Sequence, residues 1–168
     1  RFMDLHLVRE TVSTEYAKRA EKLFSLKENP RFGYAYETLG WLCSVLSLKS
    51  DLGLRLREAY KAGDKAALKK AADDDIPKII DYLEKFISAY RRQWYHENKT
   101  FGFIAQEIRL GGLTERMRSV KMRLDDYAEG RTDMIEELET EPLPYSPDKV
   151  GNYHAHIGWR NILTAGQL

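Results

Sequence analysis

The sequence predicts an all-α protein, an antiparallel helical bundle that ends in an extended, proline-rich C-terminal arm. Apolar residues recur at three- and four-residue intervals through most of the chain, which is the spacing of one face of an α-helix. Before the C-terminal tail, no stretch of six residues alternates cleanly between apolar and polar, so no strand is indicated. With 168 residues and no internal repeat, the chain has the length of one domain, residues 1–168.

Two helical regions are predicted in the N-terminal half. Residues 15–26 carry apolar side chains at helical spacing, and Asn29-Pro30 ends that segment. Residues 32–62 show the same spacing and end at Gly63, with Asp64 as the N-cap of the next helix. This second region is one long helix, or two helices that separate near residues 51–53.

The next predicted helices flank an acidic triplet, residues 73–75. A short helix over 66–72 precedes the triplet, and a longer amphipathic helix follows it from Pro77 to Trp94. Proline suits the first turn of a helix, and acidic side chains are favourable at the positive end of the helix dipole. We therefore interpret the triplet as a helix start, because a cation site of the calcium-loop type would need a glycine and a distal glutamate.

The run from Trp94 to Leu113 combines aromatic residues and three glycines with Arg109, without a hydrophobic period. We expect the backbone to turn, or to approach another surface, at Gly102 and at Gly111-Gly112, on both sides of a short helical segment. Flat apolar faces beside a planar guanidinium are what interfaces prefer, although a packed helix corner explains the run equally well. The candidate surface residues are Trp94, Asn98, Phe101, Phe103, Arg109, Gly111 and Gly112.

The last predicted helices lie between residues 114 and 138. Thr114 opens an amphipathic helix that ends at Gly130, and a short helical turn covers 135–138. Three prolines within residues 141–147 exclude regular helix and favour an extended crossing. The tail after Gly151 is ambiguous.

Charge and cysteine usage narrow the function classes. The 27 basic and 26 acidic residues leave a net charge of +1, which gives no electrostatic reason to expect nucleic acid or a membrane as partner. Cys43 is the only cysteine, so we expect no disulfide framework and favour a reducing, cytoplasmic compartment. No apolar run has the length of a membrane span. Because the chain starts at Arg1 and not at methionine, we expect it to be a piece of a longer protein.

The histidines and the acidic cluster are weaker candidates for chemistry. His154 and His156 would point the same way on a strand, as two metal ligands should, but no third ligand accompanies them. His96 could act as a general base, but no nucleophile is attached to it by sequence. The glutamates at 136, 137, 139 and 141 are interpreted as a solvated face. Leu39-Gly40-Trp41 and the pair Tyr34 and Tyr36 could line a pocket, but we interpret them as core. We expect no metal, no other cofactor and no catalytic residue.

The run and its downstream neighbours also carry a family pattern. Its residues are Trp94, Glu97-Asn98-Lys99, Phe101-Gly102-Phe103, Arg109 to Leu113, Arg116, Leu124, Tyr127, Gly130 and Ile135 to Glu139. This pattern resembles the C-terminal helical domain of bacterial glycoside hydrolase family 20 enzymes, the β-N-acetylhexosaminidases. The tail resembles the way these proteins end, at Asn152-Tyr153, Ile157 and Asn161 to Ala165. Two positions depart from it: Thr100 stands where proline is expected, and Ile104 where an acidic residue is expected.

The resemblance implies a parent enzyme with an N-terminal α/β domain, a (β/α)₈ catalytic barrel and then this domain. In that family the barrel supplies an adjacent Asp-Glu pair. The Glu protonates the glycosidic oxygen, and the Asp orients the substrate's acetamido group for attack on the anomeric carbon. The chain contains no Asp-Glu dipeptide and is shorter than the about 250 residues that such a barrel takes. We therefore expect the catalytic machinery to lie elsewhere and this chain alone to be inactive.

The leading hypothesis is an accessory domain of an exo-β-N-acetylhexosaminidase that hydrolyses terminal β-linked N-acetylglucosamine or N-acetylgalactosamine. Its expected partner is the catalytic barrel of the same polypeptide, with a second subunit as a further candidate and the carbohydrate substrate bound by the full enzyme. In that assembly Trp94, Phe101, Phe103 and Arg109 would contact the barrel or a neighbouring active-site rim. The alternatives are a free-standing helical protein-interaction module and a carbohydrate-binding module.

Overall fold

The computed structural model describes residues 12–140, and within this range every regular element is a helix. The predicted all-α class is therefore confirmed. The elements are α1 (Val12–Phe24), α2 (Gly33–Lys49), α3 (Leu52–Lys61), α4 (Lys65–Lys70), the π-helical segment η2 (Ala71–Asp75), α5 (Ile76–Glu97), α6 (Phe103–Ala128) and α7 (Glu136–Glu139). The predicted proline-rich arm and the pair His154 and His156 lie outside the described residues.

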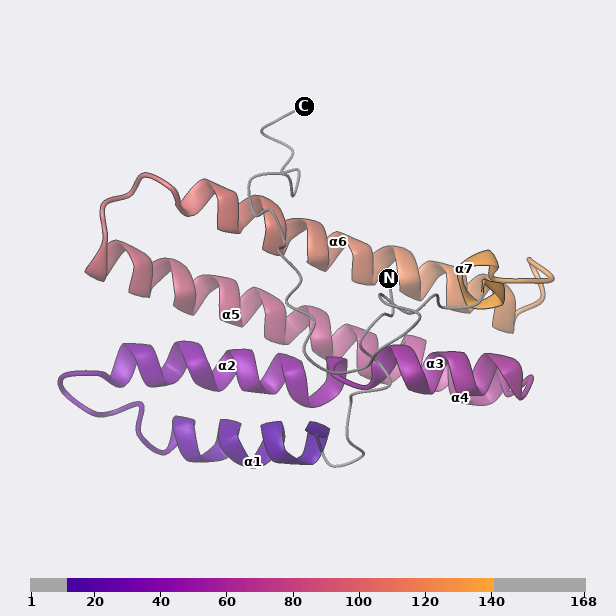
Figure 1. Ribbon diagram of the computed structural model, residues 1–168, viewed down its shortest axis with the longest axis horizontal. Coiled ribbons are helices and arrows are strands. Elements are labelled where there is room, and N and C mark those ends of the chain that lie inside the picture. The colour runs from indigo at the N-terminus through magenta and orange to yellow at the C-terminus, as the bar shows by residue number, and fades with distance from the viewer. Residues whose placement is uncertain (1–11, 141–168) are drawn as a thin grey trace, which may run out of the picture.

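Four helices form the body of the bundle. α1 packs on α2, α2 on α5 and α5 on α6, and each helix runs antiparallel to the next, as Figure 1 shows. The shorter α3 and α4 lie at one end, where α7 packs beside the end of α6 (Figure 1). The turns between α1 and α2 and between α5 and α6 lie at the other end.

The core follows the apolar stripe of α5. Ile76, Ile79, Leu83 and Phe86 recur at helical spacing and are all buried. Leu68 of α4, Leu56 of α3 and Leu124 of α6 close around this stripe in one cluster. The interpretation of Leu39-Gly40-Trp41 as core holds only in part: Gly40 is buried, and Trp41 makes an edge contact with Phe24, with ring centroids 4.7 Å apart, but Leu39 is exposed.

The region 32–62 forms two helices, which settles the alternative left open by the sequence. α2 ends at Lys49, and α3 begins at Leu52 with Asp51 as its N-cap residue. Gly63 adopts a left-handed φ of 68° after α3, and the Asp64 carboxylate accepts the Ala67 N–H at 2.9 Å. The predicted stop and N-cap at residues 63–64 are therefore confirmed.

The interpretation of residues 73–75 as a helix start is wrong. These aspartates lie within the π-helical segment η2, and the chain stays helical from Lys65 to Glu97. The Ile76 N–H donates to the Ala71 carbonyl, five residues back, and Pro77 follows with no N–H to donate. Both π-bulges and prolines interrupt the regular hydrogen bonding of long helices. The features that resemble a helix start therefore mark an interruption within a continuous helical segment.

The expectation of a short segment before Gly111-Gly112 and a new helix at Thr114 is also wrong. α6 runs without a break through both glycines. Thr114 is buried, and its hydroxyl donates to the Leu110 carbonyl at 3.0 Å. Burial of Met117 and Leu124 on the same face outweighs the helix-propensity cost of each glycine, about 1 kcal/mol.

Gly33, at the start of α2, is a position where we expect a single methyl group to destabilise the fold. A Cβ atom there would lie 2.1 Å from the Lys27 carbonyl oxygen, so the α1–α2 turn would have to move. We expect Gly33→Ala to lower the free energy of unfolding by about 1–3 kcal/mol, the usual cost of overpacking. Urea denaturation measures it, with Gly111→Ala as the matched control because a Cβ there meets nothing within 4 Å. Equal stability of Gly33→Ala and the wild type would contradict the expected clash.

Candidate docking surface

The turn between α5 and α6 is fixed by local hydrogen bonds. Asn98 ends α5, and its N–H donates to the Trp94 carbonyl at 2.8 Å. The Trp94 indole N–H donates in turn to the Lys99 carbonyl at 2.9 Å. Gly102 then adopts a φ of 97°, in the left-handed region that favours glycine, and α6 begins at the next residue. The predicted backbone turn at Gly102 is therefore confirmed.

Phe103 packs against the α5 side of this turn. Its side chain is 1 % exposed and contacts the rings of Tyr90, Trp94 and Tyr95 at centroid distances of 5.5, 5.7 and 5.7 Å. The Arg91 guanidinium lies over the Phe103 ring and pairs with Glu107 of α6 at 3.1 Å. Phe103 is thus a packing residue that supports a surface without being part of it.

Phe101, two residues earlier, is 86 % exposed, and Ile104 is 65 % exposed. Along α6, Ile104, the half-buried Ile108 and Gly111-Gly112 follow one another at three- and four-residue intervals, away from the buried face of that helix. We call this set the α6 outer face: Phe101, Ile104, Ile108, Gly111 and Gly112.

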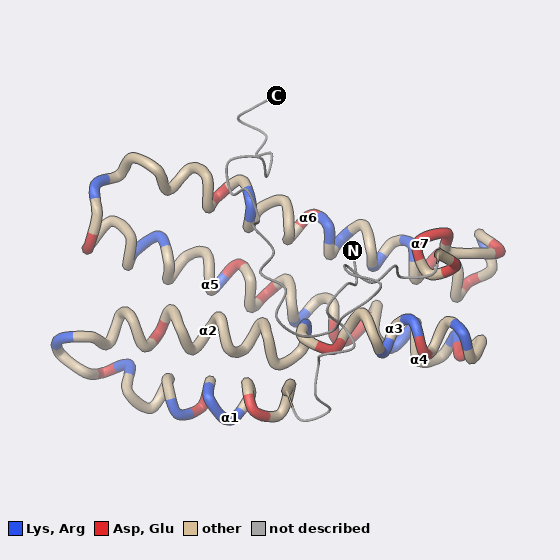
Figure 2. The backbone as a smooth tube through the Cα atoms, viewed as in Figure 1, with Lys and Arg blue, Asp and Glu red and all other residues tan. Residues whose placement is uncertain are grey.

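The α6 outer face lies outside the buried core of this domain. The two glycines are exposed, and a Cβ at either position would meet nothing within 4 Å. The first half of α6 also carries few charged residues, as Figure 2 shows. Exposed apolar side chains beside exposed glycines, which weaken a helix, are typical of a surface that another protein part covers.

The other predicted surface residues lie beside this face. Asn98 is exposed, while Trp94 and Arg109 are half-buried. The structure therefore places Phe101, Gly111 and Gly112 at exposed positions and Phe103 in the core. Ile104 and Ile108 were not among the predicted residues.

A second cluster at the same end contains His96, the candidate general base. Its imidazole makes an edge contact with the Tyr34 ring, with centroids 4.7 Å apart. A hydrogen bond to Glu97 raises the pKa of Tyr34. A raised pKa keeps the phenol protonated at neutral pH, which is the opposite of nucleophile activation. This cluster therefore offers packing and hydrogen bonds at the bundle end.

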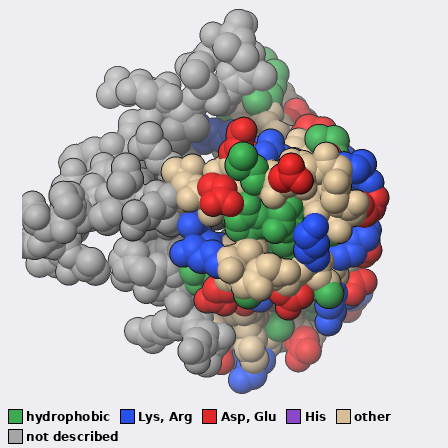
Figure 3. Space-filling model, turned by 90° about the vertical axis from the view of Figure 1, so that its right-hand side faces the viewer, with side chains coloured by type: hydrophobic (Ala, Val, Ile, Leu, Met, Phe, Trp, Pro, Cys, Tyr) green, Lys and Arg blue, Asp and Glu red, His purple; other side chains and the backbone are tan. Residues whose placement is uncertain are grey.

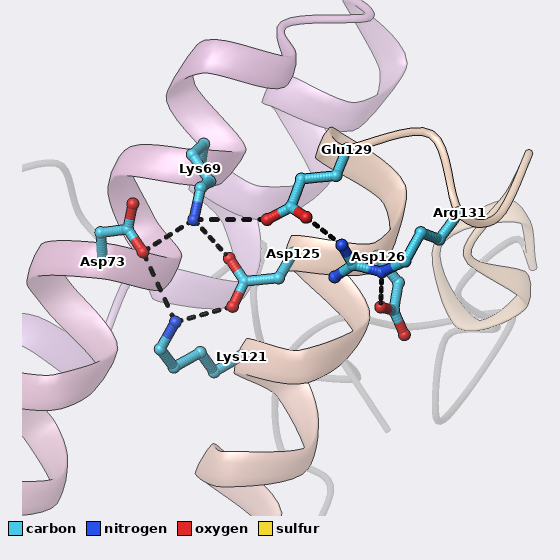
Figure 4. A network of polar contacts seen from close by, with 7 residues as sticks. All are labelled: Lys69, Asp73, Lys121, Asp125, Asp126, Glu129 and Arg131. Atoms are coloured by element: carbon cyan, nitrogen blue, oxygen red, sulfur yellow. Dashed lines mark hydrogen bonds and ion pairs between the residues drawn. The ribbon is translucent and has the colours of Figure 1, made fainter.

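Asp73, the first residue of the acidic triplet, takes part in a lysine–aspartate network. Lys69 of α4 pairs with Asp73 at 3.0 Å and with Asp125 of α6 at 2.8 Å, and Lys121 contacts the same two carboxylates at 3.4 and 2.7 Å (Figure 4). Glu129 extends the network to Arg131 (Figure 4). Among residues 12–140, no group of three or more His, Cys, Asp or Glu side chains could hold a metal ion. The network joins α4 and η2 to α6.

These contacts shift the titration of both aspartates. Hydrogen bonds, the strongest from Lys69, lower the pKa of Asp73. Burial alone would raise the pKa of Asp125, but the hydrogen bonds from Lys121 and Lys69 outweigh burial and lower it. A general acid needs the opposite, a raised pKa, so neither carboxylate has that character.

We expect the network to make the domain sensitive to acid. Because the folded state lowers both pKa values below about 3.9, the unfolded value, the network stabilises fully above that pH and is lost as pH falls through the folded values. The Tm of the wild type should therefore fall more steeply between about pH 4 and pH 2 than that of Lys69→Met/Lys121→Met, which starts lower at pH 7. Thermal unfolding followed by circular dichroism measures both slopes, and parallel slopes would contradict this assignment.

Charge is mixed on the end of the bundle that carries α3, α4 and α7. Basic and acidic side chains alternate around a small hydrophobic area in Figure 3. Such mixing differs from the basic patch by which nucleic-acid-binding surfaces are recognised. Within residues 12–140, no helix is long and apolar enough to cross a bilayer.

Comparison with known proteins identifies a family to which the chain is similar. The family model described as "Glycoside Hydrolase 20C C-terminal domain" matches residues 2–157. No curated protein matches the chain. The match covers the whole described structure, including the α5–α6 turn and the α6 outer face.

Proposed function

Because this chain belongs to the glycoside hydrolase 20C C-terminal domain family, we propose that it is the accessory domain of an exo-β-N-acetylhexosaminidase. The α6 outer face docks on the catalytic barrel of the same polypeptide. The full enzyme removes terminal β-linked N-acetylglucosamine or N-acetylgalactosamine by substrate-assisted, retaining catalysis. The reducing, cytoplasmic compartment suggested by the single cysteine is part of the same proposal.

The observation that supports docking most strongly is the combination of exposed apolar side chains and exposed glycines on α6. Phe101 and Ile104 are large and exposed, whereas the helix turn at Gly111-Gly112 presents bare backbone. Side chains or backbone of a partner can approach bare backbone closely, and the apolar residues beside it gain by leaving water. A C-terminal domain is covalently linked to its catalytic domain. The catalytic domain is therefore the partner with the highest effective concentration at the α6 outer face.

The catalytic division of labour follows from what the chain carries. It lacks the Asp-Glu dipeptide of the family's barrel. Asp73 and Asp125, whose pKa values are lowered, are held by lysines and are unsuited to donate a proton to a leaving group. Both observations support a domain that assists the barrel and leaves the acid and the nucleophile to it.

Assays on a chromogenic N-acetyl-β-glucosaminide test this division. We expect turnover by the full-length protein and none by the purified 168-residue chain. Turnover by the 168-residue chain, free of host hexosaminidase, would overturn the proposal. If both proteins are inactive on glucosaminide and galactosaminide substrates, the assignment to a hexosaminidase is wrong.

Direct sugar binding is the second candidate, favoured by one observation, the 86 % exposed ring of Phe101. An exposed aromatic ring offers an apolar face on which a sugar ring can stack. Titrating the 168-residue chain with N-acetylglucosamine, with amide chemical shifts around Trp94 and Phe101 as the readout, separates the two functions. Docking alone predicts unchanged shifts.

A further inference from the structure

A second apolar surface lies at the opposite end of the bundle from the α5–α6 turn. A groove of about 770 Å³ runs between the α2–α3 junction on one side and α6 with α7 on the other. Its apolar lining comprises Leu46, Leu52, Leu56, Leu113, Met117, Val120, Leu124, Ile135 and Leu138. The groove is separate from the α6 outer face, because it lies on the core side of that helix.

The wall formed by α7 is held in place by Tyr60 of α3. The Tyr60 hydroxyl accepts the Ile135 N–H at 3.2 Å and donates to Glu139 at 2.5 Å. Arg57 donates to the Thr140 carbonyl at 2.5 Å. Thr140 itself lines the groove, so the described part of the chain ends in the groove wall.

The rim of the groove is predominantly basic. Its charged residues are Lys49, Arg116, Arg123 and one carboxylate, Glu137. Glu137 is exposed, as the sequence suggested, and it pairs with Arg123 at 2.9 Å and approaches Arg116 at 3.8 Å. Three cations against one carboxylate favour an occupant that carries acidic side chains beside apolar ones.

The family match extends to residue 157, beyond the groove, so the segment after Thr140 is part of the same domain. We propose that the groove is the docking site of residues 141–157 of the same chain. This segment begins at the groove wall and carries two carboxylates and one lysine among apolar residues. Its apolar residues are Leu143, Tyr145, Val150, Tyr153 and Ile157, and its charged residues are Glu141, Asp148 and Lys149. Seventeen residues reach roughly 55 Å when extended, far enough to follow the groove from Thr140.

Paramagnetic broadening by a spin label on residues 141–157 tests whether this segment lies in the groove, in the full 168-residue chain. The label is attached to a cysteine that replaces Ser146, with Cys43→Ser removing the native thiol. We expect methyl signals of Leu113 and Val120, which line the groove, to broaden, while those of Leu26 in the α1–α2 turn stay sharp. Unbroadened Leu113 and Val120 signals in the folded protein would overturn the proposal and leave the groove to another partner.

Truncation provides a second, independent test. A chain that ends at Ile157 should melt like the 168-residue chain, whereas a chain that ends at Thr140 should lose roughly 5 °C or more in Tm, the scale for exposing two buried apolar side chains. A synthetic peptide of residues 141–157 should restore that loss when added in excess, and a scrambled peptide of the same composition should not. Should the shorter chain fail to fold, Leu143→Asp/Tyr145→Asp in the full chain must lower the Tm and Ser146→Asp must not. Equal melting of all these chains contradicts the proposal, and none of the outcomes depends on docking to the barrel.

Discussion

Replacing Phe103 with alanine should lower the free energy of unfolding of this domain by about 3–5 kcal/mol, the range for removing a buried phenylalanine. The ring is 1 % exposed and lies among three other aromatic rings, so its loss leaves a cavity between α5 and α6. The turn that carries Phe101 would lose its support at the same time. Urea denaturation at about 25 °C, with the slope checked for two-state behaviour, measures the change.

Phe101→Ala is the matched control for this prediction. The two phenylalanines are separated only by Gly102, but Phe101 is 86 % exposed. We expect its replacement to change stability by no more than about 0.5 kcal/mol, as at other exposed positions. Equal losses from both variants would show that the turn packs differently from this description.

Placing arginine at Gly112 should have opposite effects in the 168-residue chain and in the full-length protein. In the 168-residue chain alone, the free energy of unfolding should rise by up to about 1 kcal/mol. Arginine is a better helix former than glycine, and a side chain at this position meets nothing within 4 Å at its Cβ. In the full-length protein, the arginine side chain would enter the docking interface and lower the stability of this domain by about 2 kcal/mol or more, as at the centre of other interfaces. Calorimetry of both proteins measures whether the substitution raises or lowers the stability of each.

Glu21→Arg controls for a new surface arginine, because it changes the net charge by +2 where Gly112→Arg changes it by +1. Glu21 is exposed on α1, which lies at the far edge of the bundle from α6 (Figure 1). We expect this variant to unfold like the wild type in both proteins. If the full-length protein tolerates Gly112→Arg as well as the isolated chain does, the α6 outer face is not the docking interface.

The sequence predicts a helix with a single apolar stripe, such as α5, but it does not predict that α6 is one continuous helix. α5 has a single apolar stripe, so its spacing identified both the helix and its buried face. The first half of α6 also carries Ile104 and Ile108 outside its buried face, and Gly111-Gly112 resembles the end of a helix. Tertiary packing of Met117 and Leu124 decides that this segment is a continuous helix.

The sequence does not show which residues of the candidate surface are exposed. Phe101 and Phe103 are chemically identical in the sequence, and only the left-handed turn at Gly102 sends one outward and the other into the core. Ile104 and Ile108 join the surface because α6 starts at Phe103, one residue after that turn. Within the lysine–aspartate network, the pairs Lys69–Asp73 and Lys121–Asp125 have the i,i+4 spacing that a sequence can show. The contacts that join them have no such signal, since Lys69 and Asp125 meet only in the folded bundle.

Thiol protection tests the docking of the α6 outer face most directly. In a Cys43→Ser background, a cysteine is placed at Ile104, which is 65 % exposed, or at Lys18 on α1 as the control. A maleimide should label both cysteines at similar rates in the 168-residue chain, with each labelled peptide identified by mass spectrometry. In the full-length protein, we expect labelling at position 104 to slow at least tenfold while labelling at position 18 stays unchanged. Equal labelling of position 104 in the two proteins would contradict docking through this face.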